Sequence, residues 1–278
     1  MQKKRKMLDP IRKFEIERNK RIKSYSNDID LLKASKSFLQ KSVTSKYSYN
    51  FSWLGRPIIQ YPQDIVAFQE IVWNIKPDLI IETGIAHGGS LMLSASLLAM
   101  LDLLDHGEAK IVPRTNKPRR VVAVDIDIRS HNLEAIINHG LNPRLTLIEG
   151  SSIDKKIIER IYHEASEHEN ILICLDSNHT HEHVLEELEA YAPLTSIGSY
   201  CIVFDTLIDD MPRNFYPDKP WSKSYNPKTA VIDYLKILHN KGRIAYDGKP
   251  LNFEIDEQIK NKLLITVAKS GYLKRVCN

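Results

Sequence analysis

Acidic side chains follow five apolar segments of the chain, at the points where each segment gives way to a polar loop. The junctions read Glu82-Thr83-Gly84, Asp125-Ile126-Asp127, Glu149-Gly150-Ser151-Ser152, Asp176-Ser177-Asn178-His179 and Asp205-Thr206. A buried carboxylate is costly unless it is paired or hydrogen-bonded, so an apolar segment that ends in one needs a reason. Any single acid could simply cap the following helix. Together they predict a polar site for a ligand, a hard cation or a proton transfer.

The first junction opens a glycine-rich turn, IIETGIAHGGSLMLSASLL, which spans Ile80 to Leu98. Gly84, Gly88 and Gly89 allow a tight turn and a close approach of the backbone to a ligand, and a helix starting near Ser90 directs its first N–H groups there. The spacing does not fit the GxGxxG pattern of a pyrophosphate loop. An acid before the first glycine would also repel phosphates. The turn therefore favours a cationic or amino-bearing cofactor.

The elements that position these junctions alternate between apolar runs and helical patterns, for example DLIIET before SLMLSASLLAMLDLL and NILICLDS before HEHVLEELEAYAPL. Continuous Val, Ile and Leu runs suit strands covered on both faces, and intervening helices imply a parallel sheet. We therefore predict an α/β fold with a doubly wound, mostly parallel sheet. The segments LNFEIDEQ and LLITVAKSGYLKRV supply its closing strands, and one possible arrangement of these two strands is an antiparallel edge pair. Ligands of such sheets bind beyond the carboxyl ends of the strands. A polar surface insertion, DHGEAKIVPRTNKPRR, precedes the second strand.

The composition describes a globular chain of 278 residues with 42% hydrophobic content, enough for one sizeable core. No run of about 18 uncharged apolar residues occurs, and the N-terminus lacks the apolar core of a secretory signal. We expect a cytoplasmic protein. Cys174, Cys201 and Cys277 have no CxxC spacing, and we interpret them as reduced packing thiols.

Residues 1–50 form a basic arm. They carry 14 Lys and Arg against 5 Asp and Glu, a charge of +9, which leaves −5 for the rest of the chain. A loose helical stripe predicts one or two amphipathic helices that pack on the body or on a second subunit. Contact with nucleic acid or an anionic membrane is the less favoured alternative. The stripe consists of Ile11, Phe14, Ile22, Ile29, Leu32 and Phe38.

Three segments carry a resemblance to a known family: WLGRPIIQYPQDIVAFQEIVWNIKPDLIIETGIAHGGSLMLSA, ILICLDSNHTHEHVLEELEAYAPL and YCIVFDTLIDDMP. They resemble the cephalosporin hydroxylase and rhamnosyl O-methyltransferase family of class I S-adenosylmethionine-dependent methyltransferases, roughly from Ser52 to Leu238. The resemblance implies a Rossmann-like methyltransferase domain over residues 51–278, with residues 1–50 as a helical N-terminal extension. It implies an O-methyltransferase assisted by a divalent metal such as Mg²⁺.

The resemblance also assigns the cofactor contacts. Glu82 and Gly84 would lie near the methionine and ribose of S-adenosylmethionine, and Asp125 would accept both ribose hydroxyls through charge-assisted bonds. The remaining cofactor contacts would come from Gly88, Gly89, Ser90, Ile126, Gly150, Ser151, Ser152 and Asp176.

A divalent cation makes a hydroxyl more alkoxide-like by lowering its pKa. Asp176, Asp205 and Thr206 are the predicted metal ligands. In relatives an acidic pair follows the fifth strand, whereas here the pair reads Phe204-Asp205. One expected ligand is therefore absent, with Thr206 or Asp209 as its replacement, and a metal-independent route through a base stays open.

That base would be His179, which acts together with Asp176 in catalysis, because an imidazole accepts a proton near neutral pH. His181 and His183 are expected to be solvated. An iron oxygenase, suggested by the hydroxylase name, would need two of these histidines and a carboxylate on one face, which the H-x-H-x-H spacing disfavours.

The acceptor would contact residues 207–227, a long segment punctuated by prolines. Its aromatic side chains Phe215, Tyr216, Trp221 and Tyr225 suit the C–H faces of a sugar, although such a loop can also simply pack on the body. We predict an O-methyltransferase that acts on a hydroxyl of a sugar, glycan precursor or other small hydroxylated molecule, and that forms a homo-oligomer through its arm. A non-catalytic S-adenosylmethionine-binding regulator and a nucleic-acid methyltransferase remain alternatives.

Overall fold

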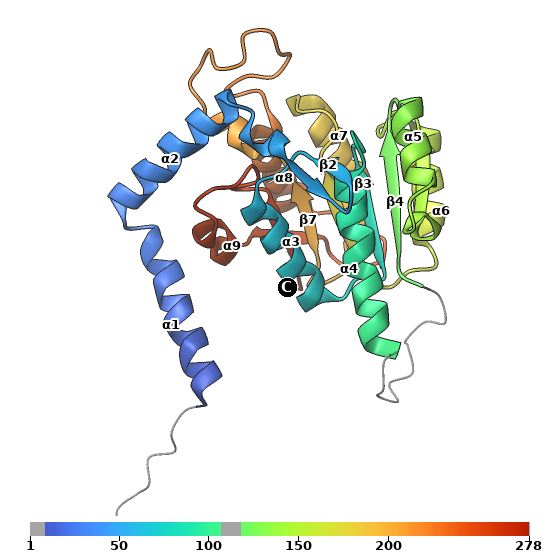
Figure 1. Cartoon of the computed structure of the whole chain (residues 1–278), viewed down its shortest axis with the longest axis horizontal. Coiled ribbons are helices and arrows are strands. Elements are labelled where there is room, and N and C mark those ends of the chain that lie inside the picture. The colour runs from blue at the N-terminus through green and yellow to red at the C-terminus, as the bar shows by residue number, and fades with distance from the viewer. Residues whose placement is uncertain (1–8, 107–117, 278) are drawn as a thin grey trace, which may run out of the picture.

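The computed structural model describes residues 9–106 and 118–277, and its center is a seven-stranded sheet in the order β5-β4-β3-β6-β7-β9-β8 (Figure 1). The first five strands of that order are parallel, whereas β9 is antiparallel to both β7 and β8. The predicted doubly wound, mostly parallel sheet is thus confirmed, with its antiparallel edge pair. The strands are β3 (Leu79–Thr83), β4 (Arg120–Asp125), β5 (Leu145–Glu149), β6 (Ile171–Leu175), β7 (Tyr200–Val203), β8 (Asn252–Ile255) and β9 (Tyr272–Val276).

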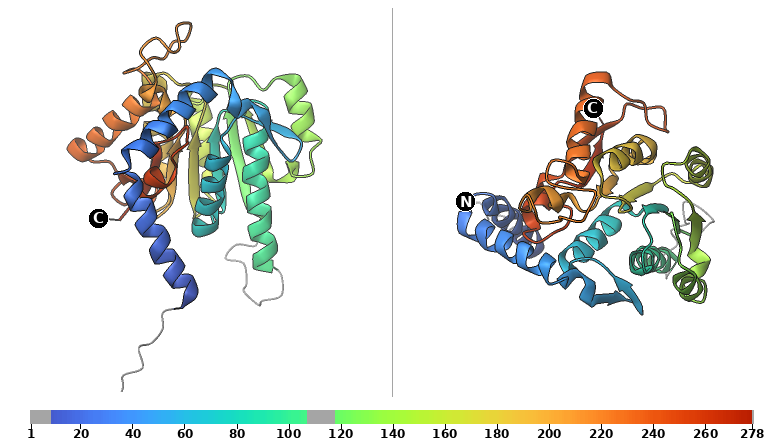
Figure 2. Two further views of the ribbon diagram at one scale, coloured as in Figure 1. Left: turned by 60° about the vertical axis from the view of Figure 1, so that its left-hand side comes forward. Right: turned by 90° about the horizontal axis from the view of Figure 1, so that it is seen from above.

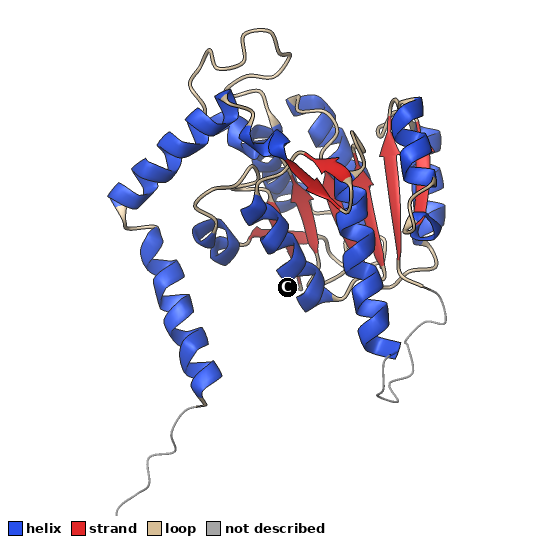
Figure 3. Cartoon of the chain, viewed as in Figure 1, coloured by secondary structure: helices blue, strands red, loops and turns tan. Residues whose placement is uncertain are grey.

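Helices cover both faces of the sheet (Figure 3). Alternate residues of each strand point to opposite faces, so Ile80 packs with one group of helices and Leu79 and Ile81 with the other. Because both faces are covered, the central strands read as unbroken apolar runs. The first face carries α3 (Pro62–Ile75), α4 (Gly89–His106) and α5 (Ser130–Ile137), and the second carries α6 (Lys155–Ala165), α7 (His181–Tyr191) and α8 (Pro227–Lys241).

The strand register brings the predicted acids to one edge. Thr83 at the end of β3 pairs with Val124 on β4 and with Leu175 on β6. Asp125 and Asp176 each follow those partners by one residue, so they lie level with Gly84 at the carboxyl ends of three adjacent strands. The parallel pairing of β6 with β7 adds Asp205 to the same edge.

The N-terminal arm forms two helices, α1 (Pro10–Tyr25) and α2 (Ile29–Thr44), which lie at the end of the molecule that also holds the C-terminal elements (Figure 2). The predicted arm helices are confirmed. The chief neighbour of α1 is the short α9 (Glu257–Lys262), and Asn19 accepts a hydrogen bond from Gln258. Ile22 of the predicted stripe is buried, whereas Ile11 and Phe14 are 70% and 57% exposed.

A short hairpin of β1 (Phe51–Trp53) and β2 (Arg56–Ile58) follows the arm and leads the chain across the sheet edge into α3. Cys174 and Cys201 are buried free thiols, as expected for packing residues, and Cys277 is exposed. The polar insertion predicted before β4 lies largely outside the described residues. Within the described ranges, no helix is both long enough and apolar enough to span a bilayer.

Candidate active site

Asp125 holds the turn that follows β3. One carboxylate oxygen accepts hydrogen bonds from the backbone N–H groups of Ile85 (2.7 Å) and Ala86 (3.2 Å), and the other accepts one from Asp127 N–H (3.2 Å). Backbone donors that converge on a carboxylate stabilise its charged form. The negative charge at the end of β4 is therefore built into the fold.

A pocket of about 220 Å³ opens beside this carboxylate. Its wall combines the Asp125 carboxylate, the apolar Ile126 and the hydroxyls of Ser151 and Ser152, and Asp176 closes it on one side. A carboxylate suits ribose hydroxyls, and an apolar wall beside hydroxyls suits a flat base, so these residues fit a nucleoside cofactor. The other lining residues are Gly84, Ala86, Val124, Ser177, Asn178 and His183.

The glycines of the turn also let other parts of the chain pack against it. Gly84 and Gly88 have positive φ values of 89° and 82°, as a tight turn requires. A Cβ on Gly84 would lie 2.1 Å from the carbonyl oxygen of Asp176, and one on Gly89 would lie 2.2 Å from the carbonyl oxygen of Pro57, so only glycine lets these segments pack this closely. We call the cavity beside Asp125 the nucleoside-type pocket. Of the cofactor contacts predicted in this turn, Gly84 lines that pocket, whereas Gly88, Gly89 and Ser90 do not.

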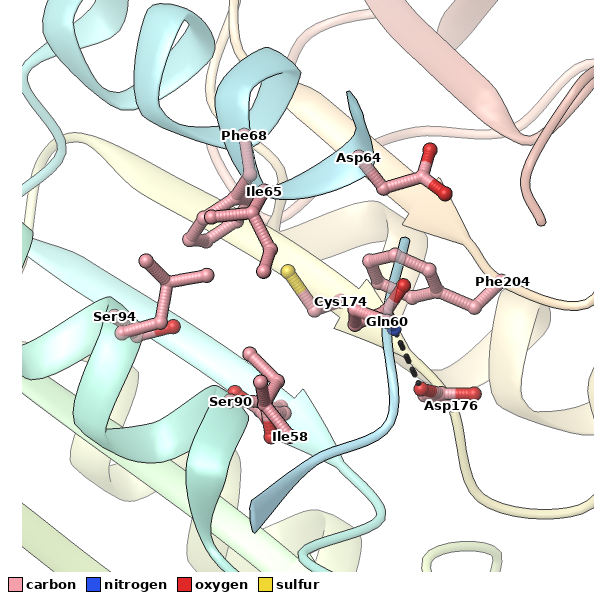
Figure 4. A pocket seen from close by; sticks show the side chains of 12 residues that line it. Ile58, Gln60, Asp64, Ile65, Phe68, Ser90, Ser94, Cys174, Asp176 and Phe204 are labelled. Carbon is pink, nitrogen blue, oxygen red and sulfur yellow. Dashed lines mark hydrogen bonds between the residues drawn. The ribbon is translucent and has the colours of Figure 1, made fainter. Parts of the chain in front are cut away.

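Glu82 faces a second, mainly apolar cavity, shown in Figure 4. Its carboxylate is 4% exposed and accepts hydrogen bonds from Ser90 and Ser94, and burial raises its pKa to about 7. Asp176 borders both this cavity and the nucleoside-type pocket. Glu82 and Asp125 thus line two different cavities, whereas the sequence predicted a single crevice for both. The lining includes Ile58, Gln60, Asp64, Ile65, Phe68, Leu93, Cys174 and Phe204.

Asp176, His179 and Asp205 form a cluster whose potential ligand atoms all lie within 4.8 Å of one another. His179 Nε2 lies 3.2 Å from Asp205 Oδ2. Burial, and then the charges of Asp205 and Glu82, raise the pKa of Asp176 well above its usual range. Among the described residues neither aspartate of the cluster forms an ion pair with Lys or Arg. Two carboxylates and an imidazole suit a divalent cation, which would relieve this repulsion.

The backbone of Asp205 supports the cluster. Its φ is 54°, in the left-handed region that residues with a Cβ seldom adopt. The conformation directs the chain from β7 into the short helix η4 (Thr206–Asp210) and leaves the carboxylate beside His179. Strain of this kind, on the order of 1 kcal/mol, is found where the surrounding structure fixes a functional side chain.

The two predicted replacements for the absent acid lie elsewhere. The Thr206 hydroxyl donates to the carbonyl of Val267 (3.5 Å) and accepts from the N–H of Ser270 (3.4 Å). Asp209 accepts a hydrogen bond from Asn226 and lies 3.5 Å from the Lys228 ammonium. Thr206 is thus held by the segment that precedes β9, and Asp209 by the start of α8.

His181 and His183 are not solvated, contrary to the prediction. The His181 side chain is 19% exposed, stacks on Tyr225 and hydrogen-bonds to Thr229 (2.8 Å). His183 is 18% exposed and hydrogen-bonds to Ser152 (3.0 Å) on the wall of the nucleoside-type pocket. The alternating spacing turns each ring toward a different neighbour, so only His179 reaches the two aspartates.

The segment after β7 brings aromatic rings to the cluster. The rings of His179 and Trp221 meet edge to face, with centroids 4.8 Å apart. Phe215 and Tyr216 pack beside Leu207 and Met211 in a small apolar cluster. Burial, and then the charge of Asp205, raise the pKa of the Tyr216 phenol, so Tyr216 as well as Trp221 lies near the site.

This combination of fold, nucleoside-type pocket and acidic cluster defines a class I methyltransferase. The chain belongs to the Rhamnosyl O-methyltransferase/CmcI family, whose model matches residues 45–276. The prediction of a S-adenosylmethionine-dependent O-methyltransferase is thereby confirmed.

Several relatives carry the name "Rhamnosyl O-methyltransferase". The protein from Mycobacterium tuberculosis is 28% identical over 215 residues, which cover 76% of this chain and 73% of the relative. The protein from Mycobacterium leprae is 27% identical over 226 residues, which cover 81% and 82%. A solved structure described as "cmcI-D160 Mg-SAM" superposes with a TM-score of 0.52 at 17% identity, covering 82% of this chain and 78% of that one, and it shows the shared fold.

Proposed function

We propose that this enzyme transfers the methyl group of S-adenosylmethionine to a hydroxyl of a sugar or another small hydroxylated molecule, assisted by a divalent cation. One observation carries the proposal: Asp176 belongs both to the Asp176, His179 and Asp205 cluster and to the wall of the nucleoside-type pocket. A methyl donor in the pocket and an acceptor hydroxyl at the cluster would therefore meet at one carboxylate.

In this mechanism Asp125 holds the ribose, Ile126 and the Ser151 and Ser152 hydroxyls border the base, and Asp176 faces the methyl-bearing end of the cofactor. Asp176 and Asp205 would hold the cation, which would lower the pKa of a coordinated hydroxyl. Transfer would be an in-line displacement of the hydroxyl oxygen on the methyl carbon.

With Asp176 and Asp205 as the groups that would hold the cation, His179 would serve as the general base. Its Nε2 lies 3.2 Å from Asp205 Oδ2, at the acidic cluster, and would accept the proton of the acceptor hydroxyl. The new bond joins the hydroxyl oxygen to the methyl carbon, the carbon–sulfur bond breaks, and its electron pair stays on the sulfur of S-adenosylhomocysteine. Among the described residues the cluster contains one histidine, His179. An iron oxygenase site would need two histidines and a carboxylate, so the cluster disfavours that function.

The acceptor class rests on Trp221 and on the relatives. An indole beside the reacting group suits the C–H face of a sugar ring, and the mycobacterial relatives are named for rhamnosyl acceptors. We therefore propose a deoxyhexose of the rhamnose type, carried on a glycan precursor or small molecule, as the first acceptor to examine.

The arm supports self-association. Ile11, Phe14 and Ile29 are exposed on a segment of charge +9, and the rest of the chain carries −5. A second copy offers both an apolar counterpart and an opposite charge. We propose a homo-oligomer built through residues 1–50, and light scattering of a chain lacking residues 1–44 would give an unchanged mass if the arm had no such role.

Incubation of the purified enzyme with S-adenosylmethionine, Mg²⁺ and rhamnosides tests the function. We expect S-adenosylhomocysteine to form only when an acceptor is present, and the acceptor to gain one methyl group by mass spectrometry. The matched control replaces rhamnose by its deoxy analogues lacking one hydroxyl each. Cofactor binding without turnover on any hydroxylated acceptor would instead favour a binding protein that is not an enzyme.

A further inference from the structure

Gln60 lies against the acidic cluster but belongs to none of the roles described above. It sits between β2 and α3, in the segment that crosses the sheet edge, and its side chain is 7% exposed. Its Nε2 donates a hydrogen bond to Asp176 Oδ2 at 3.3 Å (Figure 4). Among the described residues its Oε1 is buried without any hydrogen-bond partner. A buried carbonyl oxygen left in this state is destabilising, so it needs an explanation.

Phe204, a neighbour of this unpaired Gln60 oxygen in the cavity, cannot supply an oxygen ligand itself. It stands directly before Asp205, at the position where the family resemblance places an acid, and its ring lines the same cavity as Gln60 and Asp176. A phenyl ring cannot bind a cation through oxygen. The cluster therefore keeps two carboxylates and one imidazole, whereas hard cations such as Mg²⁺ prefer a shell rich in oxygen atoms.

The distances suit a replacement from across the cavity. Adjacent ligands of an octahedral Mg²⁺ lie about 3.0 Å apart, because each is about 2.1 Å from the ion. The Gln60 amide nitrogen is 3.3 Å from Asp176 Oδ2. A half-turn of the planar amide exchanges Nε2 and Oε1 without moving the rest of the side chain.

We infer that Gln60 Oε1 is a ligand of the divalent cation and supplies the oxygen that Phe204 cannot. The inference rests on the proposed cation at Asp176 and Asp205. In the cation-free state the amide donates to Asp176, and cation binding turns the amide so that its orphan oxygen finds a partner. The Gln60 amide is neutral, so it would add an oxygen ligand to the cluster without adding a third negative charge.

Mn²⁺ binding to the purified full chain tests the inference, measured by electron paramagnetic resonance of the free ion and by calorimetry. Gln60→Met keeps the side-chain length and replaces the amide by a thioether, a poor ligand for a hard cation. We expect the Mn²⁺ dissociation constant to rise about tenfold or more, a change typical of a disrupted metal site. Gln63→Met is the matched control, because Gln63 is exposed three residues further on.

Gln60→Met itself separates a ligand from a residue that only donates a hydrogen bond to Asp176. A donor role predicts that this variant binds Mn²⁺ as tightly as the wild type or more tightly, because loss of the N–H frees the Asp176 carboxylate, whereas a ligand role predicts weaker binding. Gln60→Glu keeps an oxygen at the same place, so a ligand role predicts Mn²⁺ affinity equal to or tighter than that of the wild type. Weaker binding by Gln60→Glu, or wild-type affinity of Gln60→Met, would overturn the inference.

Two further measurements are needed to interpret the result. Thermal melting of each variant without Mn²⁺ checks that it folds, and Phe204→Glu added to Gln60→Met should restore affinity by returning an acid to the cluster. Failure of that rescue in a folded double variant would also overturn the inference. Wild-type affinity in Gln60→Met alone leaves the proposed function standing, whereas absence of Mn²⁺ binding to the wild type would overturn both.

Discussion

The two halves of the sheet edge treat their acids in opposite ways. Over β3 and β4, Asp125 accepts three backbone N–H groups, and the turn that it binds is fixed before any ligand arrives. Over β6 and β7, Asp176 and Asp205 lie close together without a Lys or Arg partner among the described residues, and the pKa of Asp176 is raised strongly. The carboxylate of one half is hydrogen-bonded by the backbone, whereas the two carboxylates of the other half have no basic partner among the described residues.

Under the proposed function, this difference separates cofactor affinity from turnover. A preformed carboxylate lowers the cost of ordering the cofactor site, so the half around Asp125 would govern cofactor binding. A divalent cation relieves repulsion between crowded carboxylates, so the half around Asp176 would couple cation binding to chemistry.

Asp176→Asn alters the half of the sheet edge over β6 and β7, and we expect it to have the largest effect on activity. We expect turnover to fall about 100-fold or more through loss of the cation, with a much smaller change in cofactor affinity. The same variant should melt at a higher temperature than the wild type at pH 7.5 without divalent ions, because a buried charge and its repulsion from Asp205 are removed. Steady-state kinetics and calorimetry measure the first effect, and differential scanning calorimetry the second. Equal activity of both proteins would remove the cation from the mechanism.

Asp125→Ala should break the first half. It removes the ribose acceptor and also releases the N–H groups of Ile85 and Ala86, so affinity for S-adenosylhomocysteine should fall about 10- to 100-fold. Asp127→Ala is the control, since that side chain is exposed. Isothermal titration calorimetry compares the two variants, and an Asp125→Ala affinity like that of the wild type would contradict the assignment of this pocket.

The smallest of the expected effects is the pH dependence of stability that arises from Glu82 on β3. The pKa of Glu82 rises from the ordinary 4.5 to about 7 in the folded chain, because of burial. Between these pH values the folded state binds more protons than the unfolded state. The free energy of unfolding should therefore fall as pH rises from about 4.5 to 7, by up to about 3 kcal/mol from this group.

Urea unfolding at pH 5 and pH 7.5 without divalent ions measures this fall. Glu82→Gln should make it shallower, because a glutamine does not titrate, whereas Glu134→Gln on the exposed side of α5 should leave it unchanged. A fall of equal size in wild type and Glu82→Gln would show that Glu82 does not take up a proton in the folded state.

The sequence predicted the sheet, its closing strands and the edge where the acids gather, since unbroken apolar runs separated by helical patterns permit few other arrangements. It also singled out His179 from its neighbours. It did not find Gln60, because a lone glutamine between two proline-flanked segments carries no pattern that points to a site. Only the orphan oxygen and the 3.3 Å contact with Asp176 reveal it.

The roles of the glycines and of the other two histidines also needed the fold. The sequence shows that a turn lacks side chains, but the carbonyl groups of Asp176 and Pro57 decide what fills the space above Gly84 and Gly89. Helical phase indicates that His181 and His183 diverge, but it does not say which surfaces receive them.

By itself, then, the sequence determined which residues are apolar, where the strands end and which acids end them, because these follow from local periodicity and from the cost of burying charge. The tertiary structure decided how those acids are divided between two cavities, and which distant side chain faces them. Such contacts depend on the packing of segments that are far apart along the chain, and local patterns do not encode that packing.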